Sequence, residues 1–305
     1  MRLLKKMFDS KLKDNEGSII NTNEITDELT ETEKNAVLEI MRELADSFNP
    51  NEEYVIIWGL KINTDDLYNL ALKCQECECY YSANHIFDVL ATVKDDAHSF
   101  LSLGSVYSNG YGVKQDKSKA DMLYKKAIKC FEIDAKNGDG IAMYELGVCY
   151  RRGEGVEQSD IKACEYYKRA IDMGCIKLAA NNLGIMYHEG FGVEKNIEKS
   201  IEYYKMSANA GSADSQALLG NAYFKGYGVE QNYTEAIYWY LKAAEQGEGD
   251  SLYHLAVCYC NGFGFEKDRD KGIDYLYKAA EVGNPDAINA LKENGLELPS
   301  DNDQK

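Results

Sequence analysis

The sequence predicts an all-α protein in which pairs of helices stack into a solenoid. A Leu-Gly or Leu-Ala pair, with a tyrosine three residues after the Gly or Ala, occurs five times. A Gly-x-Gly follows each tyrosine, and its first glycine recurs at offsets of 43, 37, 36 and 36 residues. A period near 36 residues is typical of repeats that each contain one helix pair. The leucines that mark the copies are Leu103, Leu146, Leu183, Leu219 and Leu255.

The first helix of each copy carries one apolar face. In the third copy Leu183, Gly184 and Tyr187 stand at i, i+1 and i+4, so their side chains share a face. Glycine has no side chain, so the second helix can approach that face closely. We expect this helix to end at the Gly-x-Gly.

The second helix of each copy begins with a capping residue and ends at a glycine. Its residues include Ala163, Tyr166, Tyr167 and Ala170, which are small or apolar and stand at helical spacing. The residues expected to accept from the free N–H groups at the helix start are Asp116, Ser159, Asn196, Asn232 and Asp268. The glycines expected to end the helix are Gly138, Gly174, Gly211, Gly247 and Gly283.

This pattern resembles the Sel1-like repeat family, which is related to the tetratricopeptide repeats, over roughly residues 99–283. The resemblance implies a right-handed α-solenoid of antiparallel helix pairs with a concave groove, and a role as a scaffold or adaptor for other proteins. One secreted, cysteine-rich subgroup of the family is associated with penicillin binding and β-lactamase activity, and has a cysteine pair in each repeat. Such pairs are absent here, which argues against that activity. A hydrolase of that type is the alternative to a scaffold.

The segments outside the repeats predict caps and tails. In chain order they are a flexible basic N-terminus and polar linker (1–29), an N-terminal helix and hydrophobic segment (30–62), a degenerate capping helix pair (63–98), a C-terminal capping helix (284–295) and a disordered tail (296–305). Thr30 and Glu33 form a capping box for the N-terminal helix. Residues 54–58 fit either a buried strand or a helical turn. Residues 1–13 are more typical of a frayed basic terminus than of a peripheral membrane helix.

The second helix of the first copy is predicted to be longer than its counterparts. From Ala120 to Gly138 it has seven more residues than the matching interval in the second copy, which is about two helical turns. Cys130, Phe131 and Ile133 lie in this extension. It can contact the N-terminal helix or form a partner surface, and we expect the first.

Composition indicates a cytoplasmic protein with no cofactor. The 51 acidic and 34 basic side chains give a formal charge of −17, which argues against a nucleic-acid partner. No apolar run is long enough to span a bilayer, and residues 1–13 lack the apolar core of a secretory signal. The nine cysteines have no regular spacing, which favours reduced thiols. We expect Cys74, Cys77 and Cys79 to be buried thiols rather than a metal site, and no catalytic residues.

The predicted site is a groove lined by the first helices, which binds a peptide or protein segment. Its candidate residues differ between copies while the Leu-Gly-Tyr positions stay constant: Tyr144, Val148, Arg151, Arg152, Asn181, His188, Asn221, Phe224, Lys225 and Tyr253. The Arg151-Arg152 pair offers a grip for a carboxylate of the partner. The alternatives are a solvated groove in which Arg151 pairs with Glu145 or Glu189, and a binding surface in the N-terminal region. His188 and His254 are expected to face solvent.

Overall fold

A computed structural model describes residues 54–57, 60–63, 68, 69, 71, 72, 75, 80–94 and 96–296. Its first elements are the strands β1 (Tyr54–Ile57) and β2 (Leu60–Asn63), which pair antiparallel with Tyr54 opposite Asn63. The stretch that fitted either a strand or a helical turn is therefore a strand over residues 54–57. The predicted N-terminal tail, the capping-box helix, the cysteines at 74, 77 and 79, and residues 297–305 lie outside the described residues.

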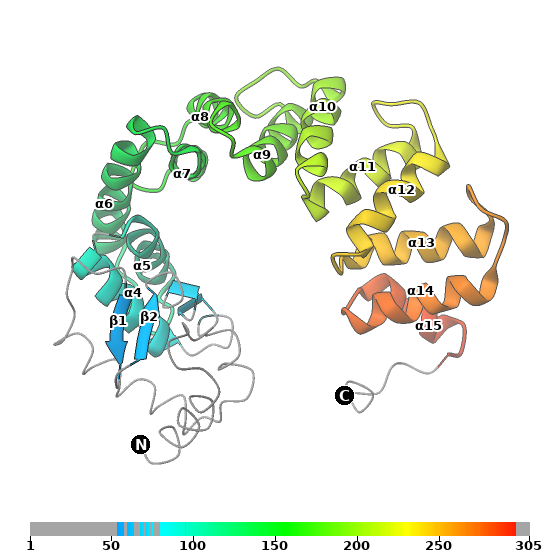
Figure 1. The fold of residues 1–305 in the computed structure, drawn as a ribbon, viewed down its shortest axis with the longest axis horizontal. Coiled ribbons are helices and arrows are strands. Elements are labelled where there is room, and N and C mark those ends of the chain that lie inside the picture. The colour runs from blue at the N-terminus through cyan, green and yellow to red at the C-terminus, as the bar shows by residue number, and fades with distance from the viewer. Residues whose placement is uncertain are drawn as a thin grey trace, which may run out of the picture. The chain divides into compact units, whose positions relative to one another are not determined.

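Helices make up the rest of the described chain, and successive helices pack as pairs (Figure 1). They are α4 (Tyr80–Lys94), α5 (Ala97–Asn109), α6 (Lys117–Lys136), α7 (Gly140–Arg152), α8 (Asp160–Asp172), α9 (Ile176–Glu189), α10 (Ile197–Asn209), α11 (Ala213–Lys225), α12 (Tyr233–Ala244), α13 (Gly249–Asn261), α14 (Arg269–Glu281) and α15 (Pro285–Glu293). The predicted all-α solenoid of helix pairs is confirmed for the repeats, and the short β1–β2 hairpin precedes them.

The chain forms two compact units. One contains residues up to Ile133 together with the loop 154–157, and the other contains 134–153 together with the chain from Gln158 onward. The second unit holds α7 to α15. It therefore includes all ten candidate residues.

The expected helix boundaries are confirmed. All five predicted residues cap their second helix: Asn196 Oδ1, for example, accepts from the Lys199 backbone N–H at 2.8 Å. Each first helix ends at the first glycine of its Gly-x-Gly, where the backbone is left-handed, as at Gly190 with φ +82°. Asn284 caps α15, and Pro285 stands in its first turn. Helix starts and stops thus follow from local side-chain chemistry.

Within a copy, the two helices approach because a glycine faces a tyrosine ring. A Cβ added to Gly184 would lie 2.6 Å from two ring carbons of Tyr204, and Gly147 and Gly220 face tyrosines in the same way. The fifth copy differs at both positions: Ala256 stands in place of the glycine and Leu276 in place of the tyrosine, and the two share one buried cluster. The larger residue on one helix is therefore matched by a smaller one on the other.

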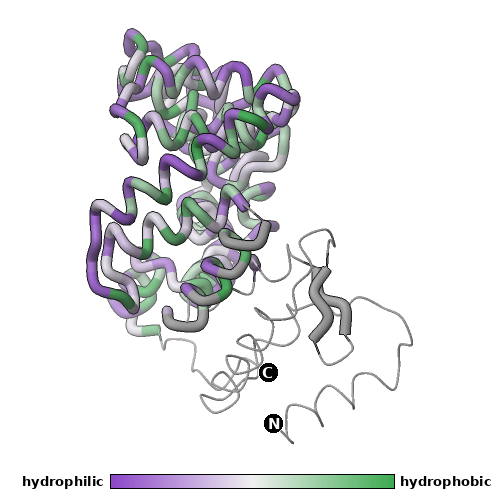
Figure 2. The backbone as a smooth tube through the Cα atoms, turned by 90° about the vertical axis from the view of Figure 1, so that its left-hand side faces the viewer, coloured by the Kyte–Doolittle hydropathy of each residue, from purple (hydrophilic) through white to green (hydrophobic). Residues whose placement is uncertain are grey.

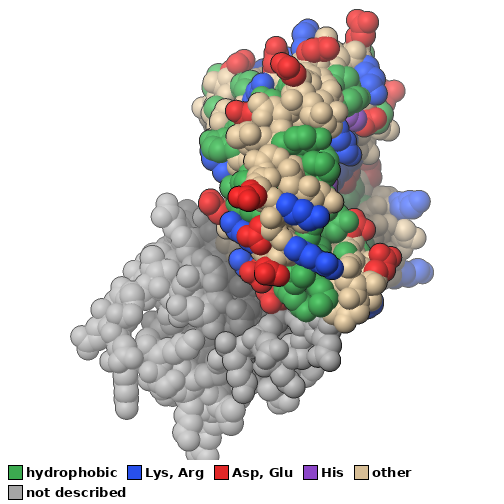
Figure 3. All heavy atoms as spheres, turned by 90° about the vertical axis from the view of Figure 1, so that its right-hand side faces the viewer, with side chains coloured by type: hydrophobic (Ala, Val, Ile, Leu, Met, Phe, Trp, Pro, Cys, Tyr) green, Lys and Arg blue, Asp and Glu red, His purple; other side chains and the backbone are tan. Residues whose placement is uncertain are grey.

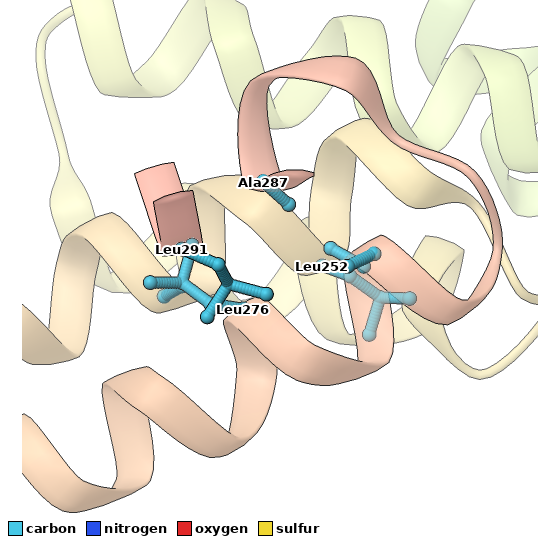
Figure 4. Close-up of a cluster of buried hydrophobic side chains, with 7 residues drawn as sticks. Leu252, Leu276, Ala287 and Leu291 are labelled. Carbon is cyan, nitrogen blue, oxygen red and sulfur yellow. The ribbon is translucent and has the colours of Figure 1, made fainter. Parts of the chain in front are cut away.

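Between copies, the Gly-x-Gly loop covers the preceding second helix. The second glycine of the motif lies against the start of that helix, at Ile161 for Gly192, Ile197 for Gly228 and Tyr233 for Gly264. At the C-terminal end, Ala287 and Leu291 of α15 pack with Leu252 and Leu276 (Figure 4). Along single helices hydrophobic and hydrophilic residues alternate, as expected where one face is buried (Figure 2).

The predicted lengthening of α6 is confirmed, and its residue Phe131 packs against α5. The helix has 20 residues, against 13 in α8 and α10. Phe131 is buried, and its ring lies edge-on to the His98 ring of α5 with 5.1 Å between centroids. Ile133 is exposed. The expected contact with the N-terminal helix falls outside the described residues; the contact that the structure shows is with α5.

Candidate functional site

The face of each first helix that points away from its second helix is set by the Leu-Gly-Tyr motif. One residue advances an α-helix by about 100°, so the positions opposite the motif are six and two residues before its Gly or Ala, and one and five after it. In the second unit these positions are all exposed or half-buried. We call them the first-helix face: Ile141, Glu145, Val148 and Arg152 of α7; Leu178, Asn182, Ile185 and Glu189 of α9; Asp214, Leu218, Asn221 and Lys225 of α11; Asp250, His254, Val257 and Asn261 of α13.

Side-chain contacts join successive first helices. Asn182 Nδ2 of α9 donates to the Tyr144 hydroxyl of α7 at 3.3 Å. Ser215 Oγ of α11 donates to Asn181 Oδ1 of α9 at 2.7 Å. The first-helix face is thus a series of neighbouring helices that one bound segment can cross.

The ten predicted residues divide into two groups. Val148, Arg152, Asn221 and Lys225 belong to the first-helix face, and of these Asn221 also accepts a hydrogen bond at its Oδ1 from the Tyr240 hydroxyl of the second helix α12 at 2.7 Å. The other six are half-buried on the flank of their helices: Tyr144, Arg151, Asn181, His188, Phe224 and Tyr253. Four of these contact the next copy. Tyr144 contacts Asn182 and Asn181 contacts Ser215 through hydrogen bonds. His188 contacts Tyr227 and Phe224 contacts Phe263 through their rings.

Phe224 lies inside an aromatic cluster. Its ring centroid is 5.3 Å from that of Tyr233 and 5.6 Å from that of Phe263. His254 completes the cluster: it stacks on Tyr240 at 5.0 Å, and its Nδ1 lies 2.7 Å from the Asp250 carbonyl oxygen. The expectation that His188 and His254 face solvent is therefore wrong in part, because both rings are half-buried against aromatic neighbours.

The basic pair sits next to two tyrosine hydroxyls. Burial raises the pKa of Tyr144, Glu145 raises it further, and Arg152 lowers it. Burial and the neighbouring Tyr144 raise the pKa of Tyr167, an effect that Arg151 opposes. Glu189, one expected partner of Arg151, is 2.7 Å from His188 Nδ1. The positive charge of the two arginines is thus placed at the C-terminal end of α7, beside polar aromatic side chains.

Three apolar members of the first-helix face were missed by the sequence reasoning. Ile141 is 53% exposed, Leu178 45% and Leu218 37%. Met173, 53% exposed, lies beside Gly140 at the start of α7, on the side of that helix that faces α8. Requiring the residues to lie opposite the Leu-Gly-Tyr motif, rather than three positions from it, would have found them.

The described residues contain no group of three or more potential metal ligands. Their six cysteines have free thiols, and burial raises the pKa of Cys258 to about 11. No helix in this part of the chain is long and apolar enough to span a bilayer.

The Sel1 repeat family matches residues 96–130, 140–175, 177–212, 213–248 and 249–284, which together are more than half of the chain. The unmatched residues 131–139 contain the α6 extension. No curated protein is significantly similar to the chain.

Among solved structures, a protective antigen of uropathogenic Escherichia coli with an SLR fold is 30% identical, with a TM-score of 0.52; the alignment covers 75% of this chain and 48% of the antigen. This chain therefore spans about half the length of that protein. A Sel1 repeat protein from Oxalobacter formigenes is 25% identical, with a TM-score of 0.57 and coverage of 74% and 89%. An immunity protein from Pseudomonas aeruginosa shares the fold at 20% identity, with a TM-score of 0.51 and coverage of 77% and 88%. With five matched repeats and this helix-pair architecture, the chain belongs to the Sel1 repeat family.

Proposed function

We propose that the protein is a non-catalytic scaffold, and that a segment of a partner protein binds across the first-helix face. The observation that carries the proposal is the exposure of Ile141 and Leu178, which occupy equivalent positions on the neighbouring helices α7 and α9. Large exposed apolar side chains at equivalent positions of successive repeats favour an interaction site on a soluble domain. Their burial against a partner supplies favourable free energy in proportion to the apolar area removed from water.

The chemistry of this face changes along the array. At the position of Ile141 and Leu178, the next two copies have Asp214 and Asp250. A segment that crosses the helices in order therefore meets two apolar side chains and then two carboxylates. A partner with apolar residues at one end and basic residues at the other is the best match.

The arginines of α7 give the face a second anchor. Arg152 is exposed and Arg151 is half-buried. The charge of Arg152 lowers the pKa of Tyr144, and the charge of Arg151 lowers the pKa of Tyr167, in each case against the larger effect of burial. Arginine and tyrosine are the residue types that most often dominate binding energy at interfaces. A carboxylate of the partner would accept hydrogen bonds here with a geometry that suits the planar guanidinium.

The test is affinity capture with a variant that changes only this face. The double variant Ile141→Asp with Leu178→Asp places two charges on exposed positions, so the fold is retained. Ile161→Asp is the matched control, because Ile161 is 62% exposed but lies on the second helix α8. Circular dichroism and a urea unfolding curve verify that all three proteins are folded.

We expect a partner that is captured by the wild type and by Ile161→Asp, and lost from the double variant. Equal capture by all three proteins would contradict the proposal and direct attention to the N-terminal region. The hydrolase alternative is tested on the same wild-type preparation with nitrocefin. Turnover of nitrocefin would overturn the non-catalytic part of the proposal.

A further inference from the structure

A stack of two cations and two tyrosines recurs beside the second helices. In the second copy Tyr150 of α7 stacks on Tyr166 of α8, with 5.4 Å between ring centroids. Lys162 Nζ lies 4.9 Å from the Tyr150 centroid, and the Arg169 guanidinium carbon lies 5.2 Å from the Tyr166 centroid. A cation therefore accompanies each of the two rings.

The fifth copy repeats the same order of side chains. Tyr259 stacks on Tyr275 at 5.5 Å, with Lys271 4.3 Å from the first ring and Lys278 5.2 Å from the second. The cation on the second-helix ring recurs in three copies at the same distance of 5.2 Å: Arg169 over Tyr166, Lys242 over Trp239 and Lys278 over Tyr275. This position, three residues after the ring on the second helix, is thus a cation position of the repeat.

The third copy has the rings but lacks that cation. Lys199 lies 5.5 Å from the Tyr187 centroid, and Tyr187 stacks on Tyr203 at 5.4 Å. Three residues after Tyr203 the chain has Met206, which is uncharged and 39% exposed. Methionine is flexible and unbranched, so it can move aside or pack along the stem of an incoming side chain.

The charges around Tyr203 favour a cation on its ring. Burial raises the pKa of this tyrosine, and Tyr187 and the exposed carboxylates of Glu202 and Asp172 raise it further. Neighbouring lysines lie over other rings: Lys168 and Lys199 over Tyr187, and Lys205 over Tyr223. Acidic, basic and hydrophobic side chains are interspersed on the face drawn in Figure 3.

We propose that the ring of Tyr203, flanked by Glu202 and Asp172, binds an arginine side chain of a partner protein. The guanidinium takes the place over the ring that Arg169 occupies in the second copy. Arginine is the preferred cation because its planar group stacks on a ring and donates to carboxylates at the same time. This site lies on the second helix of the third copy and does not depend on the first-helix face.

The test is an NMR titration of the full chain with Nα-acetyl-arginine methylamide. We expect saturable shifts of the Tyr203 ring and Met206 methyl signals, with a dissociation constant in the millimolar range. The matched ligand is the citrulline analogue, which has the same shape and no charge. Equal shifts with the citrulline analogue would overturn the proposal.

Met206→Lys restores the residue type of the sister copies, so it preserves the fold while filling the position over the ring. We expect it to weaken binding of the arginine amide about two- to fivefold, the range of a cation–π contact at an exposed site. The reverse substitution, Lys278→Met, opens the Tyr275 ring beside Asp274 and should create a second responsive ring. Unchanged binding by Met206→Lys, or no response of Tyr275 in Lys278→Met, would each contradict the proposal.

Discussion

Replacing Gly184 by alanine tests the close approach of α9 and α10. The new Cβ would lie 2.6 Å from two carbons of the Tyr204 ring, which is far inside van der Waals contact. The ring cannot move freely, because Tyr204 is packed in a cluster with Ile201 and Leu219. Alanine gains about 0.5–1 kcal/mol over glycine in a helix interior, whereas overpacking a core costs about 1–3 kcal/mol. The two ranges leave a net loss of about 0–2.5 kcal/mol in the free energy of unfolding, and we expect a value near the middle of that range because the ring is packed in that cluster.

A second substitution should relieve the clash. The fifth copy already combines Ala256 with Leu276, so Tyr204→Leu in the Gly184→Ala background reproduces a pair that this chain uses. Alone, Tyr204→Leu removes buried ring atoms and should cost about 2 kcal/mol. Since each change removes the cause of the other's penalty, the double variant should be more stable than the sum of the single effects by about 1–2 kcal/mol.

The assay is urea unfolding followed by circular dichroism for the wild type and the three variants. The m-values need to agree, because repeat arrays can unfold in segments. Ala256→Gly is the control: no tyrosine faces this position, so the expected loss is the helix propensity of about 0.5–1 kcal/mol together with about 0.8 kcal/mol for the buried methyl group. Wild-type stability for Gly184→Ala, or additive effects in the double variant, would refute the argument that the glycine sets the helix spacing.

Three further predictions concern caps, the α6 extension and titration. Asn232→Ala removes a side-chain oxygen that accepts from two backbone N–H groups at 3.0 and 3.1 Å, so it should lower the free energy of unfolding by about 0.5–2 kcal/mol. Asn232→Ser keeps a capping oxygen and should retain most of the stability in urea unfolding. Phe131→Ala should lower the free energy of unfolding by about 3–5 kcal/mol, because its ring is buried against α5. Ile133→Ala, at an exposed position of the same extension, should change it by less than about 0.5 kcal/mol. Similar losses for the two variants in denaturant unfolding would show that the extension is not packed. Burial raises the pKa of Cys258 to about 11, so as the pH rises this thiol ionises in the unfolded chain before it ionises in the folded one, and the folded state loses stability between about pH 8.5 and 11. Cys258→Ala should make the free energy of unfolding fall less steeply in this range, and an unchanged slope would contradict the prediction.

The fold was predictable from the sequence because each copy repeats the residues that determine its helix boundaries and its core. Asn196 identifies a helix start by its capping oxygen, and Gly190 identifies a helix end by its left-handed backbone. Residues 54–57 were ambiguous, since four apolar residues suit a strand or a helix equally well. Only the pairing of β1 with β2 distinguishes them.

The sequence placed the ten candidate residues on the first helices but did not distinguish the sides of those helices. Val148 and Arg152 lie on the first-helix face, whereas Tyr144 and Phe224 contact the next copy. Spacing along one helix does not reveal which flank the neighbouring copy covers. The position of Ile141 opposite the Leu-Gly-Tyr motif follows from helix geometry, whereas the contacts of Tyr144 and Phe224 with the next copy require the packed helices.

The repeats of this chain provide comparisons that separate structural positions from functional ones, and the two proposals use them differently. The position of Ile141 on the first-helix face is apolar in two copies and acidic in two, so the sister copies do not define one residue type there, and its role is tested by a disruptive charge. Met206 occupies a position that carries a cation in three sister copies with a ring at the same place, so its departure is itself informative. A restoring substitution is the stronger test there, because Met206→Lys introduces a side chain that the repeat already accommodates. Weaker arginine binding by a protein that is at least as stable as the wild type would then be due to occupancy of the ring rather than to damage of the fold.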